Sequence, residues 1–374
     1  MIRISVFVCL SWLLVCEGPA SAQIADADVL AYNAAAASGN SDQIRAAARQ
    51  LAAASIASPE DPRSGPFAYE AAWALCQAGA CAEAVPVADF AAALPVPPAR
   101  ASLLKAYVAW KAKPSRASAK ILDAALEDIA STPPSGLSAT AFLERYVSEL
   151  QEGDFSDAAG LAGTAALHFA AGGEVYAHLA IEARMVAITS RFNATTKRGS
   201  LEEMIHLRGE LNRRRIEGGD DAPEWIEKSF WTANAWQLAM EAYFSSVGQP
   251  GVSSARADEI LESYTAGLDQ ADGVYDGAPD RPFCDGKFVQ KPPMRYPTGQ
   301  SRKGQFGAVI VQFHFEDGKV RDPQVLAAVP FDGFRDDVVE TMSKWTYEPN
   351  VDPATAGCSI SHDDVVQEYV FALN

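Results

Sequence analysis

The 374-residue sequence predicts an α+β multidomain protein in which an all-α helical array precedes a small β-β-α-β domain. Three observations lead to this fold class. Alanine and leucine recur at helical spacing over the first two thirds, glycine and proline then increase, and alternating apolar residues follow near the C-terminus. We expect a signal peptide over residues 1–22, the array over 23–245, a linker over 246–290 and the final domain over 291–374.

The first residues have the order of a secretory signal peptide. Arg3 is followed by an apolar run over residues 4–15, and residues 20–22 (ASA) supply the small side chains of a cleavage site. The run is about twelve residues long, whereas a membrane-spanning helix needs roughly twenty. The sequence therefore predicts export to the periplasm with cleavage before Gln23, and an uncleaved anchor or a lipid-modified Cys16 are the alternatives.

Cleavage would leave four cysteines, which are Cys76, Cys81, Cys284 and Cys358. An even number of cysteines in an exported protein indicates disulfides, with buried free thiols as the alternative. Cys76 and Cys81 flank a short turn, so we expect them to pair and Cys284 to pair with Cys358. The spacings do not suit zinc, since the chain has no C-x-x-C motif.

The composition favours a binding protein over an enzyme. A net charge of −17 argues against binding to nucleic acid or to anionic lipid surfaces, both of which require basic patches. The sequence has no Gly-rich phosphate loop, no nucleophile elbow and no H-E-x-x-H motif. We therefore expect no catalytic residue, no cofactor and no metal.

The array carries a weak internal repeat at intervals of about 34 to 40 residues. The repeated segments begin at Ser38, Ala78, Ala112 and Glu152, and each opens with a Gly- or Pro-containing turn before an Ala-rich helix. This pattern predicts a stack of antiparallel helix pairs. The last segment, EGDFSDAAGLA, resembles the turn and second helix of a tetratricopeptide repeat (TPR). An irregular Ala-rich bundle is the alternative.

Two further patterns lie near the end of the array. A buried helix face, or a concave ligand-binding surface as the alternative, is predicted by the spacing of Trp225, Phe230, Trp231, Trp236 and Phe244. The short basic run Arg213-Arg214-Arg215 predicts a solvated helix face.

The final domain has the alternation of a sheet. Residues 307–315 read as a half-buried strand, with Val309, Val311, Phe313 and Phe315 on one face. Four elements are expected after the Asp317-Gly318 turn: a return strand over 319–329, a helix over 331–344, an extended exit over 345–349 and a closing strand over 365–373.

This order, with these residues in it, resembles the TonB C-terminal domain. The features that carry the resemblance are Tyr296-Pro297, Gly304, Gly307, Asp317-Gly318-Lys319-Val320, Pro330, Phe334 and the W-x-Y-x-P exit at Trp345, Tyr347 and Pro349. The resemblance implies a periplasmic domain that captures the "TonB box" of outer-membrane transporters as an added strand. The partner-binding residues it implies are Arg295, Tyr296, Pro297, Val365, Val366, Gln367, Glu368, Tyr369, Val370 and Phe371.

The chain departs from a typical TonB before this domain. A cleavable signal and a TPR-like array stand where that family has an uncleaved anchor and a long Pro-rich spacer. We therefore expect a periplasmic protein that binds protein partners, such as TonB-box segments, by strand addition. An energy-transducing component of TonB-dependent transport is the alternative.

Overall fold

The computed structural model describes residues 23–268, 282–294, 296, 306–330 and 334–371. The expected signal peptide and part of the expected linker therefore lie outside the described residues. The chain divides into two compact units between Arg184 and Met185, and each is described by itself. No helix within these described ranges has the length and apolar character needed to cross a membrane.

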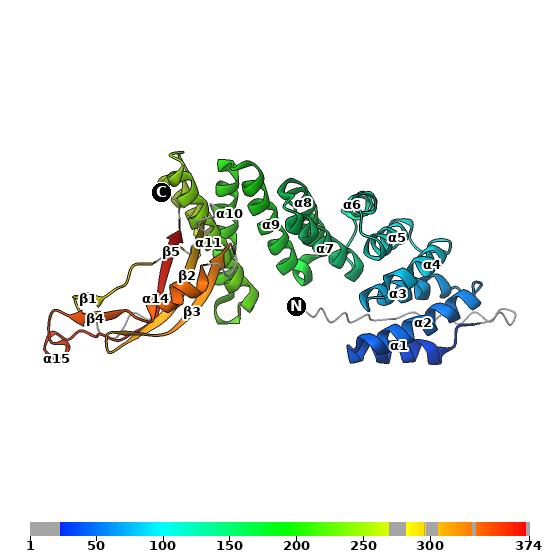
Figure 1. Ribbon diagram of the computed structural model, residues 1–374, viewed down its shortest axis with the longest axis horizontal. Helices are drawn as coiled ribbons and strands as arrows, with labels where there is room; N and C mark the ends of the chain where they lie inside the picture. The colour runs from blue at the N-terminus through cyan, green and yellow to red at the C-terminus, as the bar shows by residue number, and fades with distance from the viewer. Residues whose placement is uncertain (1–22, 269–281, 295, 297–305, 331–333, 372–374) are drawn as a thin grey trace. The chain divides into compact units, whose positions relative to one another are not determined.

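The described part of the first unit is helical (Figure 1). Its helices are α1 (Asp26–Ser38), α2 (Ser41–Ala57), α3 (Ser64–Gln77), α4 (Cys81–Ala92), α5 (Pro98–Ala112), α6 (Arg116–Ile129), α7 (Gly136–Glu152), α8 (Phe155–Ala170), the short η1 (Gly173–Tyr176) and the start of α9 (Ala177–Thr195). From α1 to α8 each helix packs on the next one in the chain, and α5 also contacts α3 and α7. Packing between near neighbours is typical of stacked helix pairs.

The four repeated segments fall at the turns inside the pairs α1–α2, α3–α4, α5–α6 and α7–α8, so the predicted pairs are confirmed. Gly39 and Gly153 end α1 and α7 in the left-handed conformation, with φ of 65° and 80°. Glycine has no Cβ and adopts this conformation without strain. In the α5–α6 turn Ser115 caps the next helix, because its Oγ accepts from the Ser118 amide at 3.1 Å.

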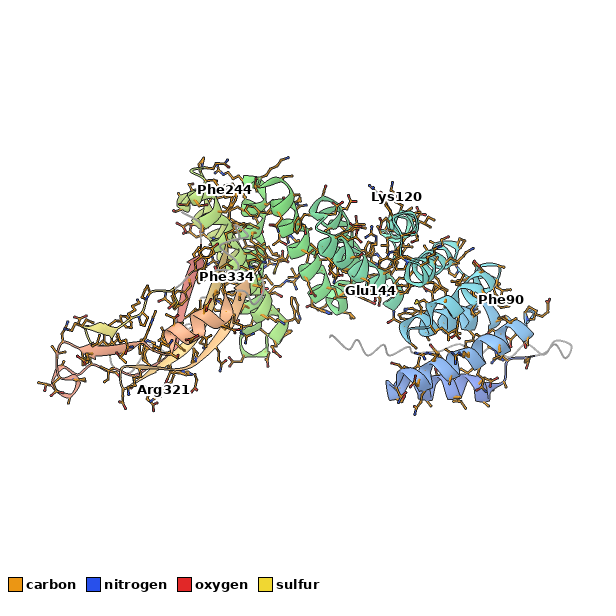
Figure 2. The ribbon with its side chains drawn as sticks, in the orientation of Figure 1. Phe90, Lys120, Glu144, Phe244, Arg321 and Phe334 are labelled. Atoms are coloured by element: carbon orange, nitrogen blue, oxygen red, sulfur yellow. A yellow bond between two sulfur atoms is a disulfide. The ribbon has the colours of Figure 1, made fainter. Side chains whose placement is uncertain are left out.

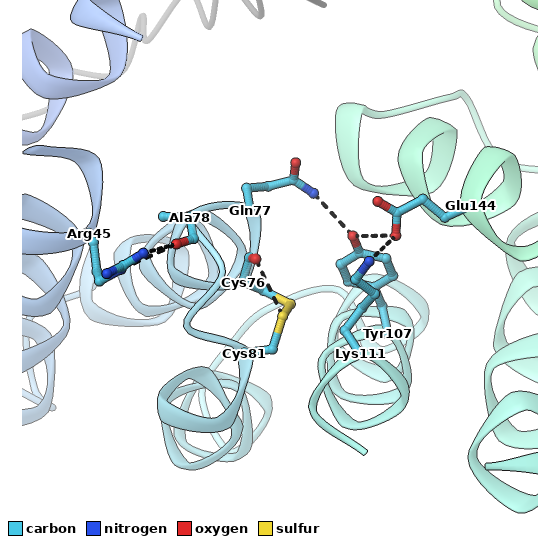
Figure 3. The surroundings of a disulfide bond; sticks show 8 residues. All are labelled: Arg45, Cys76, Gln77, Ala78, Cys81, Tyr107, Lys111 and Glu144. Atoms are coloured by element: carbon cyan, nitrogen blue, oxygen red, sulfur yellow. Dashed lines mark hydrogen bonds and ion pairs between the residues drawn. A yellow bond between two sulfur atoms is a disulfide. The ribbon is translucent and has the colours of Figure 1, made fainter. Parts of the chain in front are cut away.

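The α3–α4 turn is closed by a disulfide between Cys76 and Cys81 (Figure 3). Beside it, Arg45 of α2 donates from Nε to the carbonyl of Ala78 at 3.2 Å. The turn is therefore held by a covalent bond on one side and by the preceding helix on the other.

A polar network joins the first helices of three successive pairs (Figure 3). The Tyr107 hydroxyl of α5 accepts from Gln77 Nε2 of α3 at 3.1 Å and donates to Glu144 Oε2 of α7 at 3.0 Å. Lys111 Nζ lies 3.1 Å from the same carboxylate oxygen. The hydroxyl thus links neighbouring pairs across one face of the stack.

His168 of α8 is the fully buried imidazole of this unit. Its Nδ1 lies 3.2 Å from the Ala130 carbonyl and must donate to it, and its Nε2 lies 2.9 Å from Ser138 Oγ. Burial lowers the pKa of His168, because the charged imidazolium would lose its hydration.

The second unit begins within α9 and combines further helices with a sheet (Figure 1). The elements are α10 (Arg198–Gly218), η2 (Gly219–Asp221), α11 (Glu224–Ser246), α12 (Ser254–Thr265), β1 (Gly286–Gln290), β2 (Gly307–Glu316), β3 (Lys319–Val329), α14 (Arg335–Met342), β4 (Thr346–Pro349), α15 (Pro353–Ala356) and β5 (His362–Phe371). The strand order is β1-β4-β3-β2-β5, and the paired strands are antiparallel.

The expected β-β-α-β order is present, with the short helix α15 and two strands added to it. The exit after Trp345 forms β4, and the Gly286–Gln290 segment pairs with it as β1. This segment was expected to be linker, because its five residues lie between turn-rich stretches and show little alternation. Its strand conformation depends on pairing with β4, which is a contact distant in sequence.

The hairpin between β2 and β3 is the tight turn that Asp317-Gly318 predicted. Both residues have positive φ, at 49° and 72°, as a type I′ turn requires. A Cβ on Gly318 would lie 2.2 Å from the Tyr347 carbonyl oxygen, so only glycine fits here.

One face of the sheet carries the expected core. Val309, Val311, Phe313 and Phe315 of β2 pack with residues from α14 and from the segments that flank it, and Trp345 is 3% exposed. Figure 2 labels Phe334, which lies among these side chains just before α14. The predicted core face is therefore confirmed.

The opposite face is also covered, which the sequence did not predict. Helix α11 packs against β2, β3 and β5, and Ala308 and Ile310 on this face are fully buried. Phe306, just before β2, lies between Phe192 of α9 and Tyr243 of α11, with ring centroids 5.6 and 5.2 Å away. The expectation of a half-buried β2 was therefore wrong for its first half, because a helix distant in sequence lies across it.

We expect Trp345→Ala to destabilise the sheet by about 3 to 5 kcal/mol, because its ring is buried against Phe288 and Tyr369. Hydrogen exchange of residues 23–374, followed by mass spectrometry, should show loss of protection in β2 and β3. Trp110→Ala removes a buried tryptophan from the other unit and should leave that protection unchanged. Unchanged protection in the Trp345 variant would show that this ring is not core.

We expect His168 to make the first unit sensitive to acid. Its folded-state pKa lies below the ordinary value of 6.5, so its contribution is fully present above that pH and is lost as the pH falls below it. Urea unfolding of residues 23–374 at neutral and mildly acidic pH should show a smaller loss of stability for His168→Gln than for the unaltered chain. An equal loss of stability in both chains would contradict this role for His168.

Candidate partner-binding edge

Strand β5 forms one edge of the sheet, and within the described residues it pairs with β2 alone. In an antiparallel edge strand alternate residues direct their N–H and C=O groups outward, where a further strand can bond to them. The segment that the family resemblance pointed to therefore lies at an edge, as strand addition requires.

The two edges of the sheet differ in how open they are. Natural edges are blunted by short length, lysine, proline or a bulge. Strand β1 has five residues, begins Gly286-Lys287 and is irregular between Phe288 and Gln290. Strand β5 has ten residues and contains neither lysine nor proline, and its pairing with β2 is irregular only at its start, before Val365. The open edge of this sheet is therefore β5.

The side chains of β5 alternate between the two faces. Val365 and Tyr369 pack against the core cluster, and Phe371 stacks on Phe334 with ring centroids 4.5 Å apart. Glu368 and Val370 pair with Ile310 and Ala308, so they lie on the face that α11 covers.

Of the flanking residues, Tyr296 lies beside the end of β5. Its ring meets those of Phe334 and Phe371 edge-on, with centroids 5.7 and 5.8 Å away. Arg295 and Pro297 lie outside the described residues. The structure thus places one of the three flanking residues next to the edge strand.

The second disulfide fixes the chain where β5 begins. Cys284 precedes β1 and is bonded to Cys358, and both are buried. The Cys284 amide donates to the Ser359 carbonyl at 2.9 Å, and the Ser359 amide donates to the Pro282 carbonyl at 2.9 Å. The entry to the edge strand is therefore held by one covalent bond and two backbone hydrogen bonds.

Helix α11 supplies contacts to β5 that sequence reasoning missed. Asn234 Nδ2 donates to Glu368 Oε1 at 2.8 Å. The basic run was expected to be solvated, and Arg213 is exposed, but the Arg215 side chain is only 13% exposed and lies 4.2 Å from the Phe230 ring centroid. The expectation was wrong for Arg215, because the aromatic residues of the next helix cover it.

Other polar clusters in the described part of the chain have structural roles. Glu149, Asp154 and Asp157 approach one another closely enough to suggest a cation site. However, Glu149 already pairs with Arg145, and Asp154 caps α8 by accepting from the Asp157 amide at 3.1 Å. These contacts give the Glu149 and Asp154 carboxylates structural roles.

The comparisons with known proteins concern the sheet domain. Residues 292–360 match the family described as Gram-negative bacterial TonB protein C-terminal. The chain is similar to the solution NMR structure of the Pseudomonas aeruginosa TonB CTD, with 31% sequence identity over 24% of this chain and 88% of that chain, and a TM-score of 0.22. The comparison with curated proteins found no match. The chain therefore carries, after a large helical region, a C-terminal domain that belongs to the TonB family.

Proposed function

We propose that this protein binds protein partners of the cell envelope by adding a strand of the partner to β5. The observation that carries the proposal is the open ten-residue edge of β5, directly after the residues that match the TonB family. Outer-membrane transporters with TonB-box segments are the partner class that the family implies. Main-chain hydrogen bonds would supply much of the affinity, and side chains on either face would supply selectivity.

The chemistry of the chain supports a periplasmic setting. The structure contains two disulfides, and disulfides are typical of proteins in an oxidising compartment such as the periplasm. A cleavable signal peptide over residues 1–22 would direct export. In this proposal the stacked helix pairs of the first unit hold a second partner, so the protein works as an adaptor.

Energy transduction is the second candidate, and the family match favours it. It requires membrane attachment, since an unanchored chain cannot receive force from inner-membrane motor proteins. We expect N-terminal sequencing to place the mature start at Gln23 in the soluble periplasmic fraction. Retention of an uncleaved chain in the inner membrane would favour energy transduction instead.

We expect a proline on β5 to abolish partner capture. Of two successive residues, one directs its N–H outward, so either Gln367→Pro or Glu368→Pro removes a donor from the open edge. Capture from envelope extract should use residues 23–374 as bait, because an isolated sheet domain would expose the face that α11 covers. One of the two variants replaces the residue whose N–H points outward. With that variant, the amount of transporter captured should fall about tenfold or more relative to the unaltered chain.

The matched control is Val289→Pro, at the irregular position of the opposite edge strand. It should leave capture unchanged. Equal capture by all of these chains, with unchanged melting curves, would overturn strand addition at β5.

A further inference from the structure

An open cavity of about 490 Å³ lies beside the proposed binding edge, on the face of the sheet that α11 covers. Its lining comes from three elements of the second unit. Helix α10 contributes Arg208 and Arg215, helix α11 contributes aromatic residues and Asn234, and β5 contributes residues 366–368. A strand added to β5 would therefore run along the mouth of this cavity.

The two arginines place positive charge in the cavity, which suits an acidic group of a ligand. They are seven residues apart on α10, which places them two turns apart on one helix face. Arg208 Nη1 donates to Gln237 Oε1 at 3.0 Å, and no carboxylate lies within 4.0 Å of its guanidinium in the described part of the chain. Burial lowers the pKa of Arg208, and the carboxylates of Glu368 and Glu241 oppose this shift only in part, so a further carboxylate would replace hydration that the cation has lost.

Arg215 is positioned by an aromatic surface. Its guanidinium lies 4.2 Å from the Phe230 ring centroid and 5.8 Å from that of Trp231, and Nη1 lies 3.6 Å from Glu227 Oε1. The Nε atoms of Arg208 and Arg215 are both buried without a hydrogen-bond partner among the described residues. A planar, stacked guanidinium with free donor capacity is suited to a carboxylate.

The pairing of β5 decides which side chains of an added strand reach the cavity. Glu368 pairs with Ile310 on the α11 face and accepts from Asn234, whereas Gln367 pairs with Val311 on the core face. Residues directly opposite each other in neighbouring strands lie on the same face. The partner residues opposite Val366 and Glu368 would therefore face the arginines, and the one between them would not.

We propose that this cavity is a specificity pocket for one acidic side chain of the strand that adds to β5. The proposal rests on the function proposed above. The position opposite Val366 is the favoured one, because an acid opposite Glu368 would place two carboxylates side by side. The chain as a whole has a net charge of −17 and repels acidic peptides, so these arginines supply a local attraction that selects the register of the added strand.

Random peptides of about twelve residues, displayed on phage and selected on residues 23–374, provide the probe. Some of these peptides should fail to bind the β5 variant in which proline removes an outward N–H. Those peptides are the ones that bind by strand addition. We expect them to carry an Asp or Glu at one fixed position of their alternating pattern. In a synthetic copy of the tightest binder, replacing that acid by its amide should weaken binding about tenfold, as fluorescence anisotropy would measure.

Protein variants separate the pocket from general charge. With Arg208→Gln or Arg215→Gln, the acidic and amide peptides should bind equally. Arg213→Gln is the matched control, because it removes the same charge from the same helix at an exposed position with a 45% exposed side chain. It should preserve the tenfold preference. The peptide substitution tests the pocket on the unaltered protein, so it remains decisive even if an arginine variant does not fold.

The outcomes distinguish the two proposals. Strand-adding peptides that tolerate the acid-to-amide change within twofold would overturn the pocket and leave strand addition intact. A preference for acid that Arg208→Gln and Arg215→Gln both preserve would also overturn the pocket. A selection that yields no peptide sensitive to the β5 proline would overturn strand addition and the pocket with it.

Discussion

The packing of α11 across the second face of the sheet is the contact on which the arrangement of the second unit depends. It buries Ala308 and Ile310, and it brings Asn234 to the edge strand. Without this helix, the first half of β2 would present apolar side chains to water on a face that α14 does not cover. The helical region therefore completes the sheet domain as well as preceding it.

In the proposed binding mode, this contact would also determine which partner strands β5 can recognise. A bare edge strand offers main-chain groups, which are the same for every partner sequence. Because α10 and α11 approach β5 from one face, a partner strand would meet guanidinium and aromatic groups on that face. In that binding mode, affinity from the backbone and selectivity from the side chains would come from two different parts of the chain.

Local patterns in the sequence were sufficient for the helix pairs, the hairpin and the core face. Gly39 and Gly153 fix turns by their own conformation, and the Val309–Phe315 alternation depends on a period of two. Strand β1 and the burial of Arg215 could not be predicted, because each depends on a partner distant in sequence: β4 for the strand, and Phe230 on the next helix for the arginine. The edge position of β5 followed from resemblance, whereas the cavity beside it came from the packing of α10 and α11.

The disulfide between Cys284 and Cys358 ties the chain just before one edge strand to the chain just before the other. Only residues 359–361 separate the bond from β5, and Ser359 is held on both sides by backbone hydrogen bonds. Domain swapping, in which two copies exchange a terminal strand, needs a hinge that can swing away from its own sheet. This short, constrained hinge opposes such exchange, so the oxidised protein should keep β5 paired with its own β2. The outer edge of β5 would then stay available for the strand addition proposed above.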